Sequence, residues 1–454
     1  MATGNIDNSK AKLPKLGVIF IGRRRPGFDM DWGKAMEERV RGWLRREQTL
    51  SFFEPAEKAV DDSSLRRVMA ACETERVDAI VVLQATMGDG RLAPTVAQLW
   101  RDPVILWSTP ENQTGDMISS CSLVGTHCWA SVFRQMGHRF ELVNGAPEDA
   151  TVQRRFREAL QLAFTVRRLR SVRLGVIGGH APGYFAMGGD PFSIHHGLGV
   201  QMQTYSLIEF ANVLHELQDD AVAVDVAAVK ALELPARDIT DDDLPMASKL
   251  YLTMRSFFEN ENLDAMTIRE WPEMPNVFGQ WPYLGVARLA EEGRAIGIEG
   301  DADGALTAWI GENLGLGRCY LTDWLEHDEK TITIWHGGAA PLSLCEPGAK
   351  LVRHFNIKKP AVVEATIRAG MPVTLTRLWR CDGKYFLTAR EGETIRPRRH
   401  LMMTNGLAQL DTQNPAAWFE ELCHLGMPHH VALFAGKHEA CLRRFARSIG
   451  AQFV

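Results

Sequence analysis

The sequence lacks several patterns that would assign it to a familiar class. Its eight cysteines are scattered and include no Cys-x-x-Cys pair, which argues against a zinc knuckle and for reduced thiols. No stretch approaches the roughly 20 apolar residues that cross a membrane. The beginning, MATGNIDNSKAKLPK, has no apolar core of the kind a secretory signal carries. We therefore expect a soluble cytoplasmic protein.

A basic surplus is also missing. The chain carries 51 Lys and Arg against 56 Asp and Glu, which gives a net charge of −5. This balance offers nothing to attract nucleic acid. No Gly-x-Gly-x-x-Gly follows a strand at the required position, and no Gly-Lys-Ser/Thr occurs, so a nucleotide site is disfavoured. With 454 residues and 45% hydrophobic content, the chain can form two or three domains.

Strand and helix patterns alternate through the first part of the chain. The ranges 15–22, 77–84 and 102–110 are short and apolar, as buried strands are. The ranges 31–47 and 151–170 place apolar residues at helical spacing. This alternation predicts doubly wound parallel sheets with helices on both faces.

Two changes of pattern suggest domain boundaries. The helix predicted to end at 170 leads into a new strand and a glycine-rich turn, SVRLGVIGGHAPGYF. After about 325 the segments become short, β-branched and separated by turns, which is typical of antiparallel β structure. We expect α/β domains over 1–170 and 171–325, followed by a mostly antiparallel, barrel-like β domain over 326–454.

Four stretches place acids or histidines beside glycine or in short turns. They are GIEGDADGALTAWI with Glu299, CYLTDWLEHDEKTITIWHGG with Asp323 and His336, RPRRHLMMTNG with His400, and GMPHHVALFAGKHE with His429 and His430. Carboxylates and imidazoles without thiolates suit a divalent metal such as Mn²⁺ or Mg²⁺. Such a metal can hold two sugar oxygens while carboxylates move a proton between adjacent carbons. Taken alone, each residue is better explained by a structural role, and only the set as a whole points to a metal.

These stretches resemble the L-arabinose isomerase and L-fucose isomerase superfamily. LGVARLAEEGRAIGIEGDADGALTAWI is similar to the metal-binding stretch of those enzymes, and YLTDWLEHDEKTITIWHGGAAPLSL is similar to the segment with a second acidic ligand and a histidine. GMPHHVALFAGKHEACLRRFARSIGAQ resembles their final histidine segment. The resemblance covers roughly residues 285 to 450, with the stretches in the same order.

The resemblance implies a metal-dependent aldose–ketose isomerase. Glu299, Asp323, His336 and His430 match the metal ligands, and the metal would be Mn²⁺, with Mg²⁺ or Co²⁺ as alternatives. One of Glu299 and Asp323 would remove the C2 proton of an open-chain sugar and the other would shuttle hydroxyl protons, through a cis-enediol. His429 is expected to touch the substrate, and the protein to be a homo-oligomer, a hexamer or trimer.

The match departs from both enzyme types, so the sugar stays open. The acid at Asp323 fits the fucose type, whereas the His-His pair fits the arabinose type. Arg23, Arg24 and Arg25 could clamp an anionic sugar or form a solvated turn. Trp281 could stack on a sugar or pack in the core. Alternatives are an isomerase or epimerase of a sulfonated or phosphorylated sugar, and a non-catalytic sugar-binding protein.

The acidic start of the helix after Glu299 has its own prediction. Gly300 is expected to let the backbone turn so that the Glu299 carboxylate faces a cleft. Asp301 and Asp303 are expected to cap the helix and to favour its positive end. On this interpretation, replacing Asp301 by asparagine costs on the order of 1 kcal/mol of stability.

Overall fold

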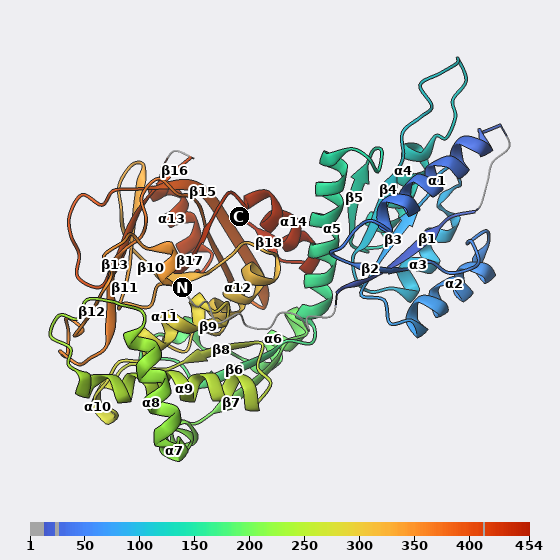
Figure 1. Ribbon diagram of the computed structural model, residues 1–454. Coiled ribbons are helices and arrows are strands. Elements are labelled where there is room, and N and C mark those ends of the chain that lie inside the picture. The colour runs from blue at the N-terminus through green and yellow to red at the C-terminus, as the bar shows by residue number, and fades with distance from the viewer. Residues whose placement is uncertain (1–12, 23–26, 412–413) are drawn as a thin grey trace. The chain divides into compact units, whose positions relative to one another are not determined.

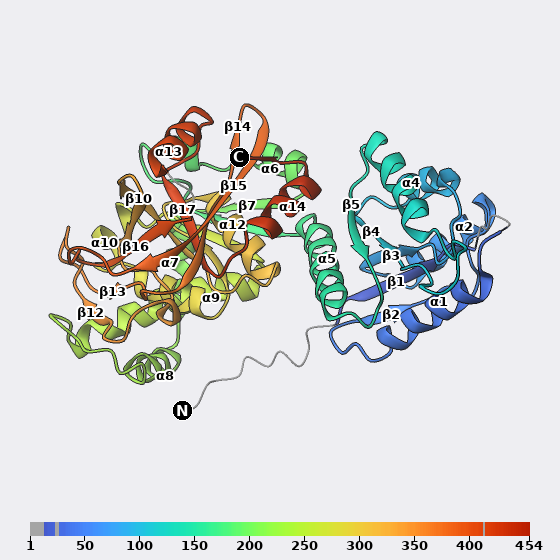
Figure 2. The ribbon, with the colours of Figure 1, turned by 90° about the horizontal axis from the view of Figure 1, so that it is seen from above.

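The computed structural model describes residues 13–22, 27–411 and 414–454. The chain divides into two compact units, residues 1–168 and residues 169–454. Both are drawn from two directions in Figures 1 and 2. The domain limits expected at 170 and 325 stay predictions. The second compact unit contains both a parallel sheet and a barrel.

The first unit is a parallel sheet covered by helices. Its strands follow the order β2-β1-β3-β4-β5, and all neighbouring pairs are parallel. The elements are β1 (Lys15–Phe20), α1 (Met30–Leu44), β2 (Ser51–Phe53), α2 (Asp62–Thr74), β3 (Ala79–Leu83), α3 (Ala93–Leu99), β4 (Val104–Ser108), α4 (Ser122–Gln135), β5 (Phe140–Asn144) and α5 (Ala150–Leu169).

Both faces of this sheet are buried. Val18 of β1 packs in one hydrophobic cluster and its neighbour Ile19 in another, so successive side chains enter opposite cores. The same alternation separates Val81 from Val82 on β3. Because both faces of the sheet are buried, the strand sequences are continuous apolar runs. The predicted alternation of strands and helices is confirmed.

The second unit begins with another parallel sheet, of order β7-β6-β8-β9. Its elements are β6 (Arg173–Ile177), α6 (Pro191–Leu198), β7 (Gln201–Tyr205), α7 (Leu207–Glu216), α8 (Asp219–Lys230), α9 (Leu244–Asn260), β8 (Ala265–Ile268), α10 (Glu273–Val277), α11 (Tyr283–Glu291), β9 (Ala295–Gly297) and α12 (Ala302–Asn313). Helix α12 is buried on every side from Ala302 to Gly311. It lies against β9 and β8 of the sheet, as Figure 1 shows, and against two later strands, β14 (Pro372–Cys381) and β17 (His430–Ala435).

Most of the remaining strands form a closed antiparallel barrel, and β12, β13 and β18 extend its sheet outside the ring. Six strands follow the order β16-β11-β10-β17-β14-β15, and the β15–β16 pairing closes the ring. The elements are β10 (Tyr320–His327), β11 (Thr331–His336), β12 (Lys350–Val352), β13 (Val362–Thr366), β14 (Pro372–Cys381), β15 (Lys384–Ile395), β16 (Thr404–Leu410), α13 (Pro415–His424), β17 (His430–Ala435), α14 (Glu439–Ile449) and β18 (Gln452–Phe453). The predicted fold class is confirmed.

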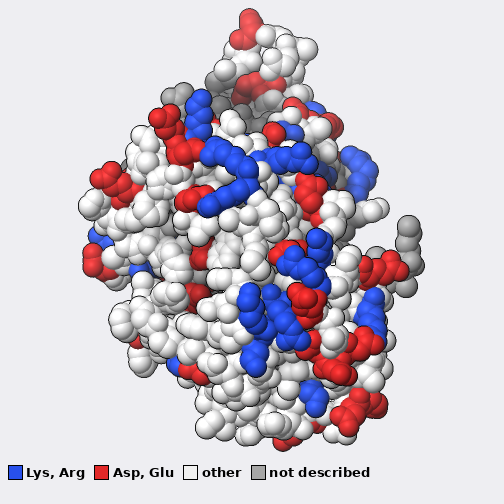
Figure 3. Space-filling model, turned by 90° about the vertical axis from the view of Figure 1, so that its left-hand side faces the viewer, with Lys and Arg blue, Asp and Glu red and all other residues white. Residues whose placement is uncertain are grey.

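The described surface and helices add two general features. On the face drawn in Figure 3, Lys and Arg side chains alternate with Asp and Glu instead of forming one area of a single sign. Among the described helices, none is both long enough and apolar enough to span a bilayer.

Candidate metal centre

Strand pairing explains how the predicted residues of the barrel meet. Asp323 on β10 lies directly opposite His430 at the start of β17 in an antiparallel ladder. Strand β11 pairs with the other edge of β10 and ends at His336. Three residues separated by up to 107 positions (430 − 323) therefore come together at one end of neighbouring strands.

Glu299 reaches the same point from the parallel sheet. It lies in the short turn between β9 and α12, and its backbone has φ +57°, in the left-handed region. Such a conformation costs a non-glycine residue about 1–3 kcal/mol and is common at functional sites. Gly300 also has a positive φ, and a Cβ there would lie 2.0 Å from the Gly179 carbonyl oxygen. The predicted need for glycine at 300 is confirmed.

The side chains of these four residues and of His429 converge. The Nε2 atom of His430 lies 3.7 Å from Oε2 of Glu299 and 3.5 Å from Oδ1 of Asp323. The Nε2 atom of His336 lies 3.9 Å from Oε1 of Glu299. Asp323, His336 and His430 offer ligand atoms within 4.8 Å of one another, as do Glu299, His429 and His430.

The donor atoms of this cluster fit a divalent cation. Oε2 of Glu299, Oδ1 of Asp323 and Nε2 of His430 are buried, and none has a hydrogen-bond partner among the described residues. Buried polar atoms without partners are rare, so three in one place indicate a missing ligand. Two carboxylates with imidazoles form a set of hard to borderline ligands. The residues present could therefore hold a divalent metal.

A buried chain of polar groups fixes the ring of His430. Its Nδ1 atom lies 2.8 Å from Oδ2 of Asp301, and the Asp301 carboxylate accepts two hydrogen bonds from Arg377 at 2.6 and 2.7 Å. All three side chains have 0% exposure. Nε2 of His430 is thus left to face the cluster, and a carboxylate hydrogen-bonded to the other ring nitrogen commonly orients metal-binding histidines in this way.

Asp301 therefore does more than the sequence suggested. It is the N-cap of α12 and accepts the Gly304 N–H at 2.8 Å, so the predicted cap is confirmed. Burial alone would raise the pKa of Asp301, but the Arg377 guanidinium and the contact with His430 outweigh it and hold the pKa well below its usual range. Asp303, in the first turn of α12, pairs with Arg380.

A second buried carboxylate, that of Glu270, was not foreseen. Its Oε2 atom accepts the backbone N–H of Glu299 at 2.7 Å, and its Oε1 atom accepts the hydroxyl of Tyr283 at 3.1 Å. Burial and the nearby Glu299 carboxylate raise the pKa of Glu270 to about 7. Burial lowers the pKa of His336, but the nearby carboxylates of Glu299 and Asp323 outweigh it and raise that pKa.

The open side of the cluster carries His429 and Tyr184. Nε2 of His429 lies 3.4 Å from Glu299 and 3.5 Å from Asp323, and its side chain is 40% exposed. The ring of Tyr184 lies 4.9 Å from that of His429. Tyr184 belongs to the glycine-rich turn after β6, and the same turn donates the Ala181 N–H to the Glu299 carbonyl. That turn was the sequence feature that could have drawn attention to Tyr184.

The two remaining predicted substrate residues lie apart from this cluster or outside the description. Trp281 is 2% exposed and stacks with Trp271 and Tyr283, so it forms part of the wall behind the cluster. Its contact with a sugar stays a prediction. Arg23 lies outside the described residues. His400 is exposed and lies 3.9 Å from Glu364, outside the cluster.

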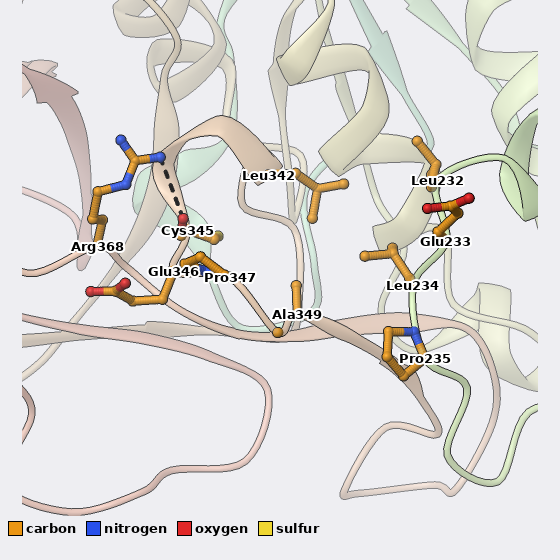
Figure 4. Close-up of a pocket in the computed structure, with 11 residues that line it drawn as sticks. Leu232, Glu233, Leu234, Pro235, Leu342, Cys345, Glu346, Pro347, Ala349 and Arg368 are labelled. Carbon is orange, nitrogen blue, oxygen red and sulfur yellow. Dashed lines mark hydrogen bonds between the residues drawn. The ribbon is translucent and has the colours of Figure 1, made fainter. Parts of the chain in front are cut away.

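A separate cavity of about 680 Å³ contains none of these residues (Figure 4). It lies between the segments 232–235 and 342–349. Arg368, at its rim, donates to the backbone carbonyls of Ser343 and Cys345. Glu233 and Glu346 line the same cavity, so it offers an anion little attraction.

Comparisons with known proteins identify relatives over most of the chain. A sulfoquinovose isomerase of Alkalicoccus urumqiensis is 30% identical over 366 residues, covering 78% of this chain and 81% of that protein. A sulfoquinovose isomerase of Priestia aryabhattai is 24% identical over 424 residues, covering 92% and 94%. L-arabinose isomerase of Bacillus subtilis (strain 168) is 23% identical over 220 residues, covering 47% and 44%.

Family models and solved structures provide no further relative on which a function could be based. No protein-family model matches the chain. Among solved structures, a glucose-galactose binding protein from Geobacillus stearothermophilus covers 67% of this chain and 93% of its own, at 10% identity. Its TM-score of 0.18 is too low to bear on fold or function.

The fold, the carboxylate–histidine cluster and these relatives together define an enzyme of the aldose–ketose sugar isomerase class. Within that class, the chain belongs to the family of the sulfoquinovose isomerases. The resemblance to the arabinose isomerase superfamily is thereby confirmed.

Replacing Asp301 by asparagine should cost far more than a lost helix cap. The change leaves the Arg377 cation buried without its partner, and breaking such a pair costs about 3–5 kcal/mol. The free energy of unfolding, measured with denaturant, should fall by that amount. The double variant D301N/R377M removes the orphaned cation and should recover most of the stability.

Metal affinity separates the two roles of Asp301. The double variant still lacks the carboxylate beside Nδ1 of His430, so its affinity for Mn²⁺ should stay about 10- to 100-fold below that of the native protein. A double variant that binds Mn²⁺ normally would show that Asp301 serves stability alone.

Proposed function

We propose that the protein is a metal-dependent isomerase of a sulfonated aldose, converting it to the corresponding ketose. The convergence of unpartnered atoms from Glu299, Asp323 and His430 carries the metal part of this proposal. The relatives named sulfoquinovose isomerases support the sulfonated substrate. This favours the anionic-sugar alternative over a neutral sugar.

Four residues are proposed to hold the metal: Glu299, Asp323, His336 and His430. When bound there, a divalent cation would supply a Lewis acid that holds two neighbouring sugar oxygens. Mn²⁺ is proposed, with Mg²⁺ or Co²⁺ as alternatives, because carboxylates and imidazoles suit these ions. The paired arrangement of the two acids is more than a sugar-binding protein requires.

The two carboxylates would move the protons of the reaction. One of Glu299 and Asp323 takes the proton from C2 of the open-chain aldose and returns it to C1, so that a cis-enediol forms and collapses. The other carries the hydroxyl proton from O2 to O1. No oxidant or reductant is consumed, since the electrons stay within the sugar. Each step needs a carboxylate oxygen that the metal does not occupy, and each of the two acids has a second oxygen that could serve.

Substrate contacts are proposed for His429, Trp281 and Arg23. His429 is partly exposed beside both acids, so it can reach the sugar hydroxyls. Arg23 would bind the sulfonate, because a guanidinium matches an oxyanion with two parallel hydrogen bonds. From the resemblance we also infer a cytoplasmic homo-oligomer, a hexamer or trimer.

Amide variants of the two acids test the proton transfer. Glu299→Gln and Asp323→Asn should each reduce turnover at least about a hundredfold, the usual range for acid–base catalysis. The double variant should be little worse, because the two groups act as a unit. Turnover is measured at saturating Mn²⁺ on protein shown to be folded by circular dichroism.

Asp328→Asn is the matched control. Asp328 lies in the turn of the same β10–β11 hairpin and pairs with Arg398 at the surface. Its variant should keep turnover within about twofold of native, since surface pairs contribute little. Near-normal turnover of folded Glu299→Gln would contradict the proposed mechanism.

Substrate selectivity tests whether the enzyme recognises a sulfonate group on its sugar. We expect kcat/KM for sulfoquinovose to exceed that for glucose, which has a hydroxyl in place of the sulfonate, by at least about a hundredfold, since glucose cannot form the charged hydrogen bond. Arg23→Ala should raise KM for the sulfonated sugar and leave the glucose rate unchanged. Equal kcat/KM for both sugars would point to a neutral substrate.

A further inference from the structure

Glu270 is a buried titratable group that contacts the proposed machinery without being part of it. Its side chain has 0% exposure. The residue follows β8 in sequence and lies at the carboxyl end of the parallel sheet. Both of its oxygens accept a hydrogen bond, one from the Glu299 backbone and one from Tyr283. Among the described contacts, none joins Glu270 to the open side of the cluster, where a sugar would enter.

The first hydrogen bond acts on the backbone of a proposed metal ligand. Glu299 has a left-handed conformation that a glutamate adopts only when its surroundings impose it. Its N–H is held by Glu270 at 2.7 Å, and its carbonyl by the Ala181 N–H at 2.9 Å. These two contacts fix the peptide planes on either side of the residue. They therefore decide where the Glu299 carboxylate points.

The second hydrogen bond connects Glu270 to the opposite wall of the cluster. The Tyr283 hydroxyl donates to Oε1 of Glu270 at 3.1 Å. The Tyr283 ring meets the imidazole of His336 edge to face, with centroids 5.5 Å apart and an interplanar angle of 88°. Nδ1 of His336 has no hydrogen-bond partner among the described residues, so packing rather than a hydrogen bond orients this ring.

We propose that Glu270 is a positioning residue that holds Glu299 and His336 in their metal-binding geometry, through the Glu299 N–H and through Tyr283. This inference rests on the proposed function, because it assumes that the cluster binds a metal. Glu270 touches neither the metal nor the sugar. Its effect must therefore show first in metal affinity, which can be measured without any substrate.

Mn²⁺ affinity of three variants, measured by titration calorimetry on the sugar-free full-length protein, tests the proposal. Glu270→Ala removes both acceptors, and the dissociation constant for Mn²⁺ should rise at least about tenfold. Glu270→Gln should stay within about threefold of native, since its amide oxygen can accept the Glu299 N–H and the tyrosine hydroxyl can accept from its amide nitrogen. Tyr283→Phe should fall between these two, as it loses the hydroxyl but keeps the ring.

Glu292→Ala provides the matched control. Glu292 also accepts the hydroxyl of a buried tyrosine, Tyr251, at 2.6 Å. It lies nine residues beyond Tyr283 in sequence, past the end of α11, and has no described contact with the cluster. Its variant should lower the thermal unfolding temperature while leaving the Mn²⁺ dissociation constant unchanged. A general loss of stability is thereby separated from a loss of positioning.

The outcomes for positioning and for isomerase function are distinct. Folded Glu270→Ala that binds Mn²⁺ as tightly as native protein overturns the positioning role, whatever the enzyme turns over. If Glu270→Ala does not fold, Tyr283→Phe with native affinity overturns the link to His336, and Glu270→Gln with strongly weakened affinity overturns the hydrogen-bond account. Native protein that binds Mn²⁺ without turning over any sugar would contradict the isomerase proposal and leave the positioning role standing.

Discussion

The buried ion pair of Asp301 and Arg377 joins the two halves of the site. Asp301 follows the parallel sheet at the start of α12, and Arg377 lies on barrel strand β14. Neither half holds the complete cluster, since Glu299 belongs to the sheet and Asp323 to the barrel. A charge pair with no exposure tolerates little displacement, because either ion alone would be left buried. The pair therefore fixes how far the sheet and the barrel can move apart.

The same pair also connects stability to chemistry. Asp301 caps α12, neutralises Arg377 and, as an ionised carboxylate, accepts the Nδ1–H of His430. On the other side of Glu299, the Glu270 carboxylate holds the N–H of the strained residue. Two buried acids thus flank the turn that presents Glu299. The strain of that turn is a local cost that the surrounding hydrogen bonds offset.

Local patterns were enough to predict some of this arrangement. The alternation of strands and helices, the turn at Gly300 and the cap at Asp301 each depend on a few neighbouring residues. The expectation of about 1 kcal/mol for Asp301 takes no account of Arg377, which lies 76 positions later and which only the folded barrel brings near. Glu270 was missed for the same reason, since its partners lie 13 and 29 positions away. No local pattern marks a carboxylate whose partners are tertiary.

Proton exchange with solvent tests the central claim, that carboxylates at this cluster move a proton between C1 and C2. The Mn²⁺-loaded protein would be incubated with sulfoquinovose in deuterated water, and the sugar followed by nuclear magnetic resonance. We expect deuterium to enter at C2 of the aldose or C1 of the ketose, at a rate that falls together with turnover in Glu299→Gln. Interconversion of the two sugars with no deuterium incorporated would contradict the account and indicate a hydride shift instead.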